Sequence, residues 1–345
     1  MKFSRNFTSP NLPIEQQITW KTCESKITKS DGTIIFHMED IEVPDHWSQQ
    51  AVNILAQKYF RKAGVPKTTG HDGDVAGLDG LPLWLAPSLP YAHTEFGSET
   101  SAKQVFHRLA GAWTYWGWEE GIFRGDKNLE SQDIGYDSEK NAQIFYDEIY
   151  YMLAHQHAAP NSPQWFNTGL FWAYRITGDA NGQWTCDDNG DTFETENSYE
   201  RPQVHACYIQ PISDNLIEEG GIFDLLKKEA RLFKHGSGTG TNFSNLRGKG
   251  EKLAGGGVSS GLMSFLKIFD TAAGAISSGG TTRRAAKMIC LDLDHPEIED
   301  FIDWKMDEER KAASLYLGSE VINRHLGDGT FLTPQSIIDR IANGF

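Results

Sequence analysis

Residues 233–286 constrain the fold more than any other part of the chain, because glycine and positive charge rise together there. Glycines gather at 236–240, 255–257 and 279–280, where a ligand can approach bare backbone. The chain as a whole carries a net charge of −15, whereas this region and its flanks are basic. Exposed amides and local positive charge together predict a phosphate-binding region. The basic residues are Lys227, Lys228, Arg231, Lys234, Arg247, Lys249, Lys252, Arg283, Arg284 and Lys287.

Any one of these glycine loops is also explained by an ordinary tight turn, so the prediction depends on the three loops together. The segment at 236–244 reads GSGTGTNFS and lacks the Gly-Lys-Ser/Thr ending of a Walker P-loop. Its glycines also lack the G-x-G-x-x-G spacing of dinucleotide-binding folds. A phosphate site here therefore belongs to another class of protein.

Composition limits the classes of protein to which the chain can belong. The net charge of −15 argues against direct binding of duplex DNA or RNA, which needs a basic surface. No run of about twenty apolar residues occurs and the first residues lack an apolar signal core, so we expect a cytoplasmic protein without a membrane segment. The cysteines form no C-x-x-C pair, so they predict neither a zinc site nor a disulfide framework. They are Cys23, Cys186, Cys207 and Cys290.

The first part of the chain contains signals for a strand, a helix and a long connection. The β-branched and aromatic content of 32–38 predicts a strand. The segment 48–63 predicts a helix with Ser48 as its N-cap. Residues 67–99 are rich in Gly, Pro and Asp, which indicates a long connection.

Two further helices lead us to expect a mainly helical domain at residues 1–158. Apolar residues at helical spacing predict a helix over 101–118, and Ser138 is expected to cap another. An aromatic stripe on the first of these helices forms either a buried face or, less commonly, a platform for stacking bases. The stripe consists of Trp113, Tyr115, Trp116 and Trp118.

Two clusters of candidate metal ligands have simpler explanations. His155 and His157 are two residues apart near a helix end, which places them on different faces. Asp187, Asn189 and Asp191 resemble part of a calcium loop, but the glycine is misplaced and no carboxylate stands at the twelfth position. A polar hairpin turn is the better interpretation, and no metal site is predicted.

Residues 159–345 show a different pattern, in which short apolar runs alternate with helices. This alternation predicts an α/β architecture with parallel strands. Strands are expected at 204–209 and 288–293, and helices at 222–233, 262–276, 296–305 with Asp294 as cap, and from 333 onward.

Cys207 is the candidate for thiol chemistry, because it lies in an apolar run just before the glycine loops. A lone strand cysteine is more often a small buried hydrophobic residue. The surroundings favour a functional role here. Ser162 lies in a turn-forming segment, Asp214 follows the strand, and Arg247 closes the first glycine loop.

Five segments, in this order, resemble the N-terminal part of vitamin B12-dependent (class II) ribonucleotide reductases. They read NSPQWFNTG, HACYIQP, EARLFKHGSGTGTNFSNLRGKGEKLAGGG, SSGLMSFLKIFDTAAGAISSGGTTRRAAKM and DLDHPEIEDFIDWK. The resemblance extends from the first residues to about Lys311. It implies a helical N-terminal domain followed, in residues 159–345, by the first part of a ten-stranded α/β barrel. It also implies adenosylcobalamin as the cofactor.

The resemblance implies roles for individual residues. Cys207 matches one of two reductant cysteines, which deliver electrons to the ribose 2′ position of a ribonucleoside diphosphate and end as a disulfide. Ser162, Ala206, Cys207 and Gly238 match contacts to that substrate. The positions that match contacts to a deoxynucleoside triphosphate effector are Asp214, Arg247, Gly279, Gly280, Thr281, Thr282, Arg283 and Arg284.

The resemblance also implies partners. Segments 249–257 and 279–286 match two specificity loops, and the helix at 262–276 is expected at a homodimer interface where the effector binds. A thioredoxin-like protein is the expected reductant of the cysteine pair.

The chain departs from the family pattern at its end. In the resembled enzymes, the radical-bearing cysteine, its Asn and Glu neighbours and the second reductant cysteine lie beyond the part that this chain matches, and Cys290 lacks such neighbours. We therefore expect an enzyme portion that needs a complementary C-terminal reductase chain. The alternative is a non-catalytic nucleotide-binding module that regulates a partner. The two hypotheses differ in whether Cys207 cycles between thiol and disulfide when that chain is supplied.

Overall fold

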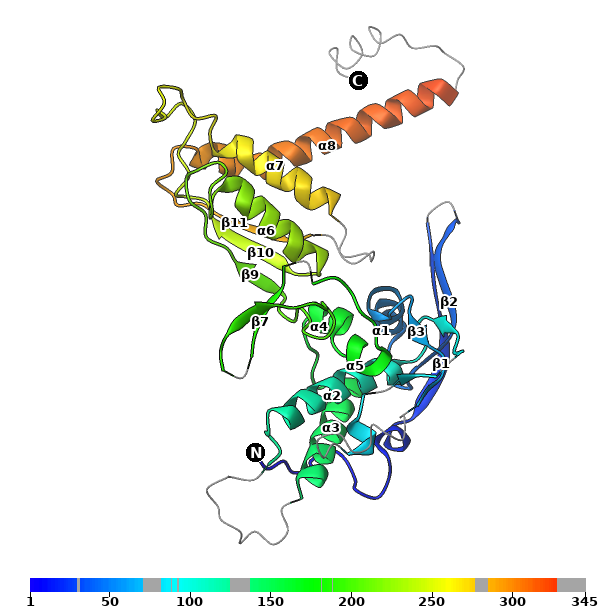
Figure 1. Cartoon of the computed structure of the whole chain (residues 1–345). Helices are drawn as coiled ribbons and strands as arrows, with labels where there is room; N and C mark the ends of the chain where they lie inside the picture. Colours follow the sequence, from blue (N-terminus) through cyan, green and yellow to red (C-terminus); the bar gives the residue numbers. More distant parts are fainter. Residues whose placement is uncertain are drawn as a thin grey trace. The chain divides into compact units, whose positions relative to one another are not determined.

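The computed structural model describes residues 1–29, 32–70, 82–87, 89–91, 93–124, 137–180, 182–187, 189–276 and 285–327, and shows mixed helices and strands (Figure 1). The chain divides into two compact units. Unit 1 consists of Met1–Ile209, Lys227–Thr239 and Ala273–Lys287. Unit 2 consists of Gln210–Leu226, Gly240–Ala272 and Met288–Phe345.

A long antiparallel hairpin stands near the start of unit 1, formed by β1 (Trp20–Thr28) and β2 (Ile34–Pro44). The strand predicted at 32–38 is confirmed and extends to Pro44, because Ile41 and Val43 are fully buried there. Sequence analysis does not predict β1, since its residues are mostly polar or charged and only Ser25 among them is buried.

Short strands organise the connection predicted at 67–99, as far as its residues are described. They pair antiparallel, β3 (Val65–Pro66) with β6 (Phe96–Gly97) and β4 (Thr69–Gly70) with β5 (Leu89–Pro90). Two 3-10 turns also lie in unit 1, at Ile14–Gln17 and Leu83–Leu85.

The predicted polar hairpin is confirmed. It joins β7 (Trp184–Cys186) to β8 (Thr192–Glu194), which pair antiparallel. The Asp187 carboxylate accepts hydrogen bonds from the backbone amides of Asn189 and Asp191, each at 2.9 Å. The Asp187 side chain thus stabilises the turn.

Side-chain caps fix where the helices of unit 1 begin. Ser48 caps α1 (Gln49–Ile54) as predicted, by accepting a hydrogen bond from the Ala51 amide. The helix continues as a π-helical turn, Leu55–Tyr59, and ends before Phe60, so the predicted range 48–63 is too long.

The next two helices begin close to their predicted positions. Ser101 and Gln104 form a capping box at the start of α2 (Ala102–Glu119), which confirms the helix predicted at 101–118. Ser138 is not the cap of α3 (Ser138–Ala154) but its first residue. Asp137 takes the cap position because its carboxylate accepts a hydrogen bond from the Lys140 amide at 3.0 Å.

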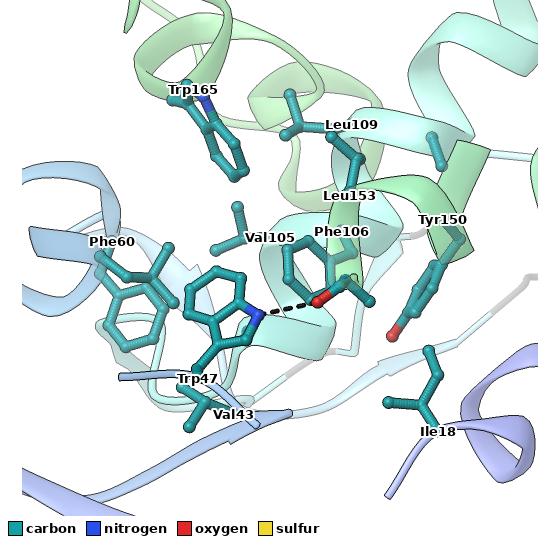
Figure 2. Packing of buried hydrophobic residues seen from close by; sticks show 14 of the residues in the cluster. Ile18, Val43, Trp47, Phe60, Val105, Phe106, Leu109, Tyr150, Leu153 and Trp165 are labelled. Atoms are coloured by element: carbon teal, nitrogen blue, oxygen red, sulfur yellow. Dashed lines mark hydrogen bonds between the residues drawn. The ribbon is translucent and has the colours of Figure 1, made fainter. Parts of the chain in front are cut away.

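The main core of unit 1 lies between the hairpin, α1, α2 and α3. Figure 2 shows the Trp47 indole beside Val105 and Phe106, with its nitrogen donating to the carbonyl oxygen of Ala154 at 2.7 Å. Tyr150 packs edge-on against Phe106, with ring centroids 5.5 Å apart. The hydrogen bond from Trp47 to Ala154 satisfies the one polar atom of the buried indole.

The aromatic stripe of α2 packs inside unit 1. Trp113 contacts the main core, and Tyr115 and Trp118 pack against a second cluster that includes Leu170 and Trp172. These contacts support a buried face rather than a stacking platform.

A fully buried ion pair joins α2 to the residues around it. Arg108 and Glu99 are both 0% exposed, and their Nε and Oε1 atoms are 2.7 Å apart. The guanidinium also donates to the carbonyl oxygens of Trp165, at 2.7 Å, and Thr168, at 2.8 Å. Tyr174 donates to Glu99, and burial holds the pKa of this phenol well above its usual value, so it remains a donor. Every member of the cluster is therefore hydrogen-bonded.

Three strands form one sheet in the order β11-β10-β9. The Gly238 amide donates to Ala206 O and the Gln210 amide to Gly240 O, so pairing advances in the same direction along both strands. The hydrogen bonds from the Thr239 amide to Ala286 O and from the Phe243 amide to Cys290 O show that β10 and β11 are parallel as well. The parallel strands are thus confirmed, whereas the described sheet is open and does not test the ten-stranded barrel. The strands are β9 (Cys207–Ile209), β10 (Gly238–Asn242) and β11 (Lys287–Cys290).

Unit 2 has its own core, to which α6 (Ile222–Lys234), α7 (Leu262–Ala275) and α8 (Ile298–Gly327) contribute (Figure 1). Leu225, Leu266 and Trp304 represent the three helices in this cluster. The helices predicted at 222–233 and 262–276 are confirmed within one residue. Unit 1 also contains two short helices, α4 (Ser162–Asn167) and α5 (Leu170–Tyr174).

The helix predicted at 296–305 is wrong in length. It begins at Ile298 and continues to Gly327, with Leu315 and Tyr316 exposed on its second half. That half lacks an apolar face at helical spacing, which is why the pattern did not reveal it. The helix predicted from 333 lies outside the described residues. In the described part of the chain, no helix has the length and apolar character needed to cross a membrane.

We predict that Arg108→Met destabilises the protein by about 3–5 kcal/mol, because Glu99 is left buried without its cation. Urea unfolding followed by circular dichroism measures the change. Lys67→Met is the matched control, since Lys67 pairs with Glu95 at the surface, and it should leave the unfolding midpoint unchanged. Equal midpoint shifts in the two variants would contradict the structural role of the buried pair.

Candidate functional site

Ser162 lies at the start of α4, in unit 1. Asn161 caps this helix by accepting a hydrogen bond from the Gln164 amide. The Ser162 hydroxyl is 3.2 Å from the Tyr59 hydroxyl. Arg108 donates hydrogen bonds to the carbonyl oxygens of Trp165 and Thr168. The buried ion pair therefore fixes the backbone of α4 and of the residue that follows it.

Asn167, the last residue of α4, connects this turn to the strand region. Its side-chain amide donates to the carbonyl oxygens of Gln203, at 3.0 Å, and His235, at 3.3 Å. Gly236 follows directly, at φ +86°, and a Cβ there would lie 3.1 Å from the Phe166 ring. The first glycine loop therefore packs against the segment that carries Ser162.

Ala206, Cys207 and Gly238 meet at the edge between β9 and β10. The Gly238 amide donates to the Ala206 carbonyl oxygen at 2.6 Å. A Cβ on Gly238 would lie 3.5 Å from the Cys207 sulfur and 3.0 Å from the Ala286 carbonyl oxygen. Glycine is thus needed at 238, where the buried backbone packs closely against Ala286 and Cys207.

Exposure alone does not distinguish Cys207 from the other thiols. Cys207, Cys186 and Cys290 are all free and exposed, whereas Cys23 is half-buried and burial raises the pKa of its thiol. Cys207 differs from the other thiols in its position. Its sulfur lies beside Gly238, which also packs against Ala286 at the end of the second specificity loop, 279–286.

A buried ion pair stabilises the neighbouring ends of β10 and β11. Lys287 forms an ion pair with Glu229 of α6, and the same carboxylate accepts a hydrogen bond from the Thr239 hydroxyl at 3.0 Å. Burial lowers the pKa of Lys287, and the Glu229 charge opposes that shift. Because Lys287 follows Ala286, the pair fixes the residue whose carbonyl oxygen packs on Gly238.

The effector candidates Asp214 and Arg247 come together in unit 2. The Arg247 Nε atom donates to the Asp214 carboxylate, and its Nη1 atom donates to Lys252 O at 3.3 Å. The Arg247 side chain is 33% exposed and the Asp214 side chain 30%, so an anion can reach the guanidinium.

Glu297 and His295, in unit 2, brace the first specificity loop. The buried Glu297 carboxylate accepts hydrogen bonds from the backbone amides of Lys249, at 3.2 Å, and Leu262, at 2.6 Å. It thereby joins the loop to the start of α7. The His295 imidazole lies 2.8 Å from Leu246 O.

The remaining effector candidates cannot be placed. Gly279, Gly280, Thr281, Thr282, Arg283 and Arg284 lie outside the described residues. Sequence analysis missed Glu229, Glu297 and Tyr59. For Glu229 the available signal was a carboxylate on the apolar face of a helix, a position that requires a buried partner.

Comparisons with known proteins agree in two separate regions. Residues 21–156 match the family model of class II vitamin B12-dependent ribonucleotide reductases, and residues 205–324 match the ribonucleotide reductase barrel domain.

Individual relatives are also vitamin B12-dependent reductases of ribonucleotides. The chain is 52% identical, over 336 residues, to a vitamin B12-dependent ribonucleotide reductase of Agrobacterium fabrum, which covers 94% of this chain and 25% of that protein. The corresponding protein of Bradyrhizobium diazoefficiens is 51% identical, with the same coverage. A vitamin B12-dependent ribonucleoside-diphosphate reductase of Mycobacterium tuberculosis is 45% identical over 30% of this chain and 14% of that protein. The chain thus spans about a quarter of the length of the first two relatives.

A solved structure, the class Id ribonucleotide reductase alpha subunit of Actinobacillus ureae, gives a TM-score of 0.34 at 19% identity. It covers 59% of this chain and 26% of that one. This likeness is too weak to support an argument about the fold.

We predict that Gly238→Ala lowers the free energy of unfolding by about 1–3 kcal/mol, because the new methyl group meets the Ala286 carbonyl oxygen in a packed strand. Gly255→Ala is the control, since no atom lies within 4 Å of a Cβ at that position. Denaturant titration of both variants tests this. A Gly238→Ala protein as stable as the Gly255→Ala protein would show that the strand edge is loosely packed.

Proposed function

Because the chain belongs to the class II, vitamin B12-dependent ribonucleotide reductase family, we propose that it is that enzyme's substrate- and effector-binding N-terminal portion. Residues 1–158 correspond to the family's N-terminal domain, and residues 159–345 to the first part of its ten-stranded barrel. The substrate is a ribonucleoside diphosphate. The enzyme acts in the cytoplasm as a homodimer, with a complementary C-terminal reductase portion.

The observation that carries this proposal is the exposed free thiol of Cys207 on β9, beside the buried backbone of Gly238 on β10. A ribose can approach the exposed sulfur from solvent. The Ala206–Gly238 hydrogen bond and the Ala286 carbonyl oxygen fix the backbone around the thiol. In this arrangement Ser162, Ala206, Cys207 and Gly238 bind and orient the substrate.

The reduction balances with a pair of thiols. The 2′ carbon–oxygen bond breaks and its oxygen leaves as water, while a carbon–hydrogen bond forms at the same carbon. The two electrons and two protons come from Cys207 and a second cysteine in the remainder of the enzyme, which are oxidised to a disulfide. A thioredoxin-like dithiol then reduces that disulfide.

The family's dependence on vitamin B12 identifies adenosylcobalamin as the cofactor, which would supply the initiating radical when bound. The cavity at Lys58–Ala63 and Lys234–Gly236 in unit 1 is lined mostly by charged and polar side chains, which do not fit the broad apolar faces of a corrin.

The effector is a deoxynucleoside triphosphate bound at Asp214, Arg247 and the loop at 279–284. Support comes from the half-exposed guanidinium of Arg247, which offers charge-assisted hydrogen bonds to phosphate. Asp214 holds that guanidinium in place until the effector binds.

We predict that Arg247→Ala weakens deoxynucleoside triphosphate binding by about 1.5–3 kcal/mol, because a charge-assisted hydrogen bond is lost. Titration calorimetry measures the affinity. Arg310→Ala on α8 is the control, since Arg310 pairs only with Asp307 at the surface among its described contacts. Unchanged affinity in a folded Arg247→Ala protein would remove this residue from the effector site.

We predict that Cys207→Ser abolishes multiple turnover in the reductase assembled with its complementary C-terminal portion. Cys290→Ser, which removes another exposed thiol, should leave turnover measurable. Deoxynucleotide formation with the thioredoxin-like reductant is the assay. Normal turnover by Cys207→Ser would contradict the reductant role and favour the non-catalytic nucleotide-binding module.

A further inference from the structure

The Tyr59 phenol is the side-chain partner of the Ser162 hydroxyl, and the two oxygen atoms lie 3.2 Å apart. The residues are 103 positions apart and come from different elements, since Tyr59 ends the turn after α1 and Ser162 begins α4. Both residues are partly exposed, and Tyr59 also lines a cavity of about 450 Å³ in unit 1. The hydroxyl pair therefore lies where a ligand can approach it, not inside the core.

An irregular turn of the backbone places Tyr59. Residues Leu55–Tyr59 form a π-helical turn, which the Phe60 amide closes by donating to Leu55 O at 3.0 Å. Such a turn contains one more residue than an α-helical turn, so it rotates the side chains that follow α1. π-Helical turns are rare and are frequent at functional sites. The turn thus gives Tyr59 a direction that the periodicity of α1 does not predict.

Neighbouring groups hold Tyr59 in this position. Its carbonyl oxygen accepts a hydrogen bond from Arg108 Nη2 at 3.4 Å. Its ring packs against Trp165 and Phe166 of α4, with a centroid separation of 5.4 Å in each case. None of these contacts uses the phenol oxygen, so a ring without the hydroxyl can keep the same place.

The chemistry of the two hydroxyls sets the direction of the hydrogen bond between them. A phenol gives up its proton more readily than an aliphatic alcohol, so Tyr59 is the better donor and the Ser162 oxygen the better acceptor. In the described part of the chain, Tyr59 is the one hydrogen-bond partner of the Ser162 hydroxyl. The Ser162 proton is therefore available to a ligand, and accepting a hydrogen bond makes this hydroxyl a stronger donor.

We propose that Tyr59 is a positioning residue for the substrate, because its phenol orients the Ser162 hydroxyl so that the serine donates to an oxygen of the ribonucleotide. The ribose and the phosphates of a ribonucleoside diphosphate supply such acceptors. This role rests on the proposed function, in which Ser162 contacts the substrate. It makes the substrate contact depend on residues 1–158 as well as on the segment that carries Ser162.

The test is a double-mutant cycle on the reductase assembled with its complementary C-terminal portion, with deoxynucleotide formation as the assay. Tyr59→Phe keeps the ring and removes the hydroxyl. It should raise KM for the ribonucleoside diphosphate about three- to tenfold and leave kcat within about twofold, because a contact shared by ground state and transition state is weakened. In a Ser162→Ala background, Tyr59→Phe should not raise KM further, because Tyr59 acts through Ser162.

Tyr316→Phe is the matched control, since it removes the hydroxyl of an exposed tyrosine on α8 that lies 3.1 Å from Glu320 Oε1. This control should leave KM within about twofold of the parent. Urea unfolding of Tyr59→Phe should give the midpoint of the parent, because the ring contacts are kept. A purely structural role would instead lower that midpoint and raise KM equally with and without the Ser162 hydroxyl, which would overturn the proposal.

The outcomes separate this role from the proposed function. If Ser162→Ala raises KM and Tyr59→Phe does not, the positioning role is wrong and the substrate contact of Ser162 stands. If Ser162→Ala leaves KM unchanged, the substrate contact assigned to Ser162 is wrong, and the role of Tyr59 is wrong with it.

Discussion

The buried ion pair between Arg108 and Glu99 is the interaction on which the rest of unit 1 depends. Its guanidinium holds the carbonyl oxygens of Trp165 and Thr168, and its carboxylate holds the Arg61 amide and the Tyr174 hydroxyl. One charged pair therefore determines where the turn with Ser162 lies and where the basic segment that begins at Lys58 runs. The cost of burying two charges is offset only because every polar atom finds a partner, which makes this position sensitive to any single change.

Buried carboxylates also hold the chain at the two specificity loops. Glycines supply no side chains to anchor such a loop, and a neighbouring carboxylate anchors the residues beside it. The Glu229 carboxylate binds Lys287 and Thr239 at the end of the second specificity loop, 279–286. The Glu297 carboxylate accepts hydrogen bonds from the amides of Lys249 and Leu262 at the first specificity loop, 249–257. Both carboxylates are nearly fully buried, so they bind these backbone and side-chain groups from inside the protein.

Local signals predicted much of the fold but not the parts that depend on distant contacts. The cap Ser48 and the helices α2, α6 and α7 follow from side-chain chemistry and spacing within a few residues. Strand β1 and the second half of α8 were missed because neither has a buried apolar face. The pairing of Asp214 with Arg247, 33 residues apart, has no local signature, and only the family resemblance brought the two together. The buried carboxylate Glu297 was missed for the same reason, whereas Glu229 could have been found from its position on the apolar face of α6.

The central claim is that Cys207 is one of the two thiols that supply electrons to the ribose. The most direct measurement is a single turnover by the assembled reductase without an external reductant, followed by alkylation of free thiols and mass spectrometry of the peptide that contains Cys207. The account predicts that Cys207 is found in a disulfide, in an amount equal to the deoxynucleotide formed. Product formation with Cys207 still recovered as a free, alkylated thiol would contradict it.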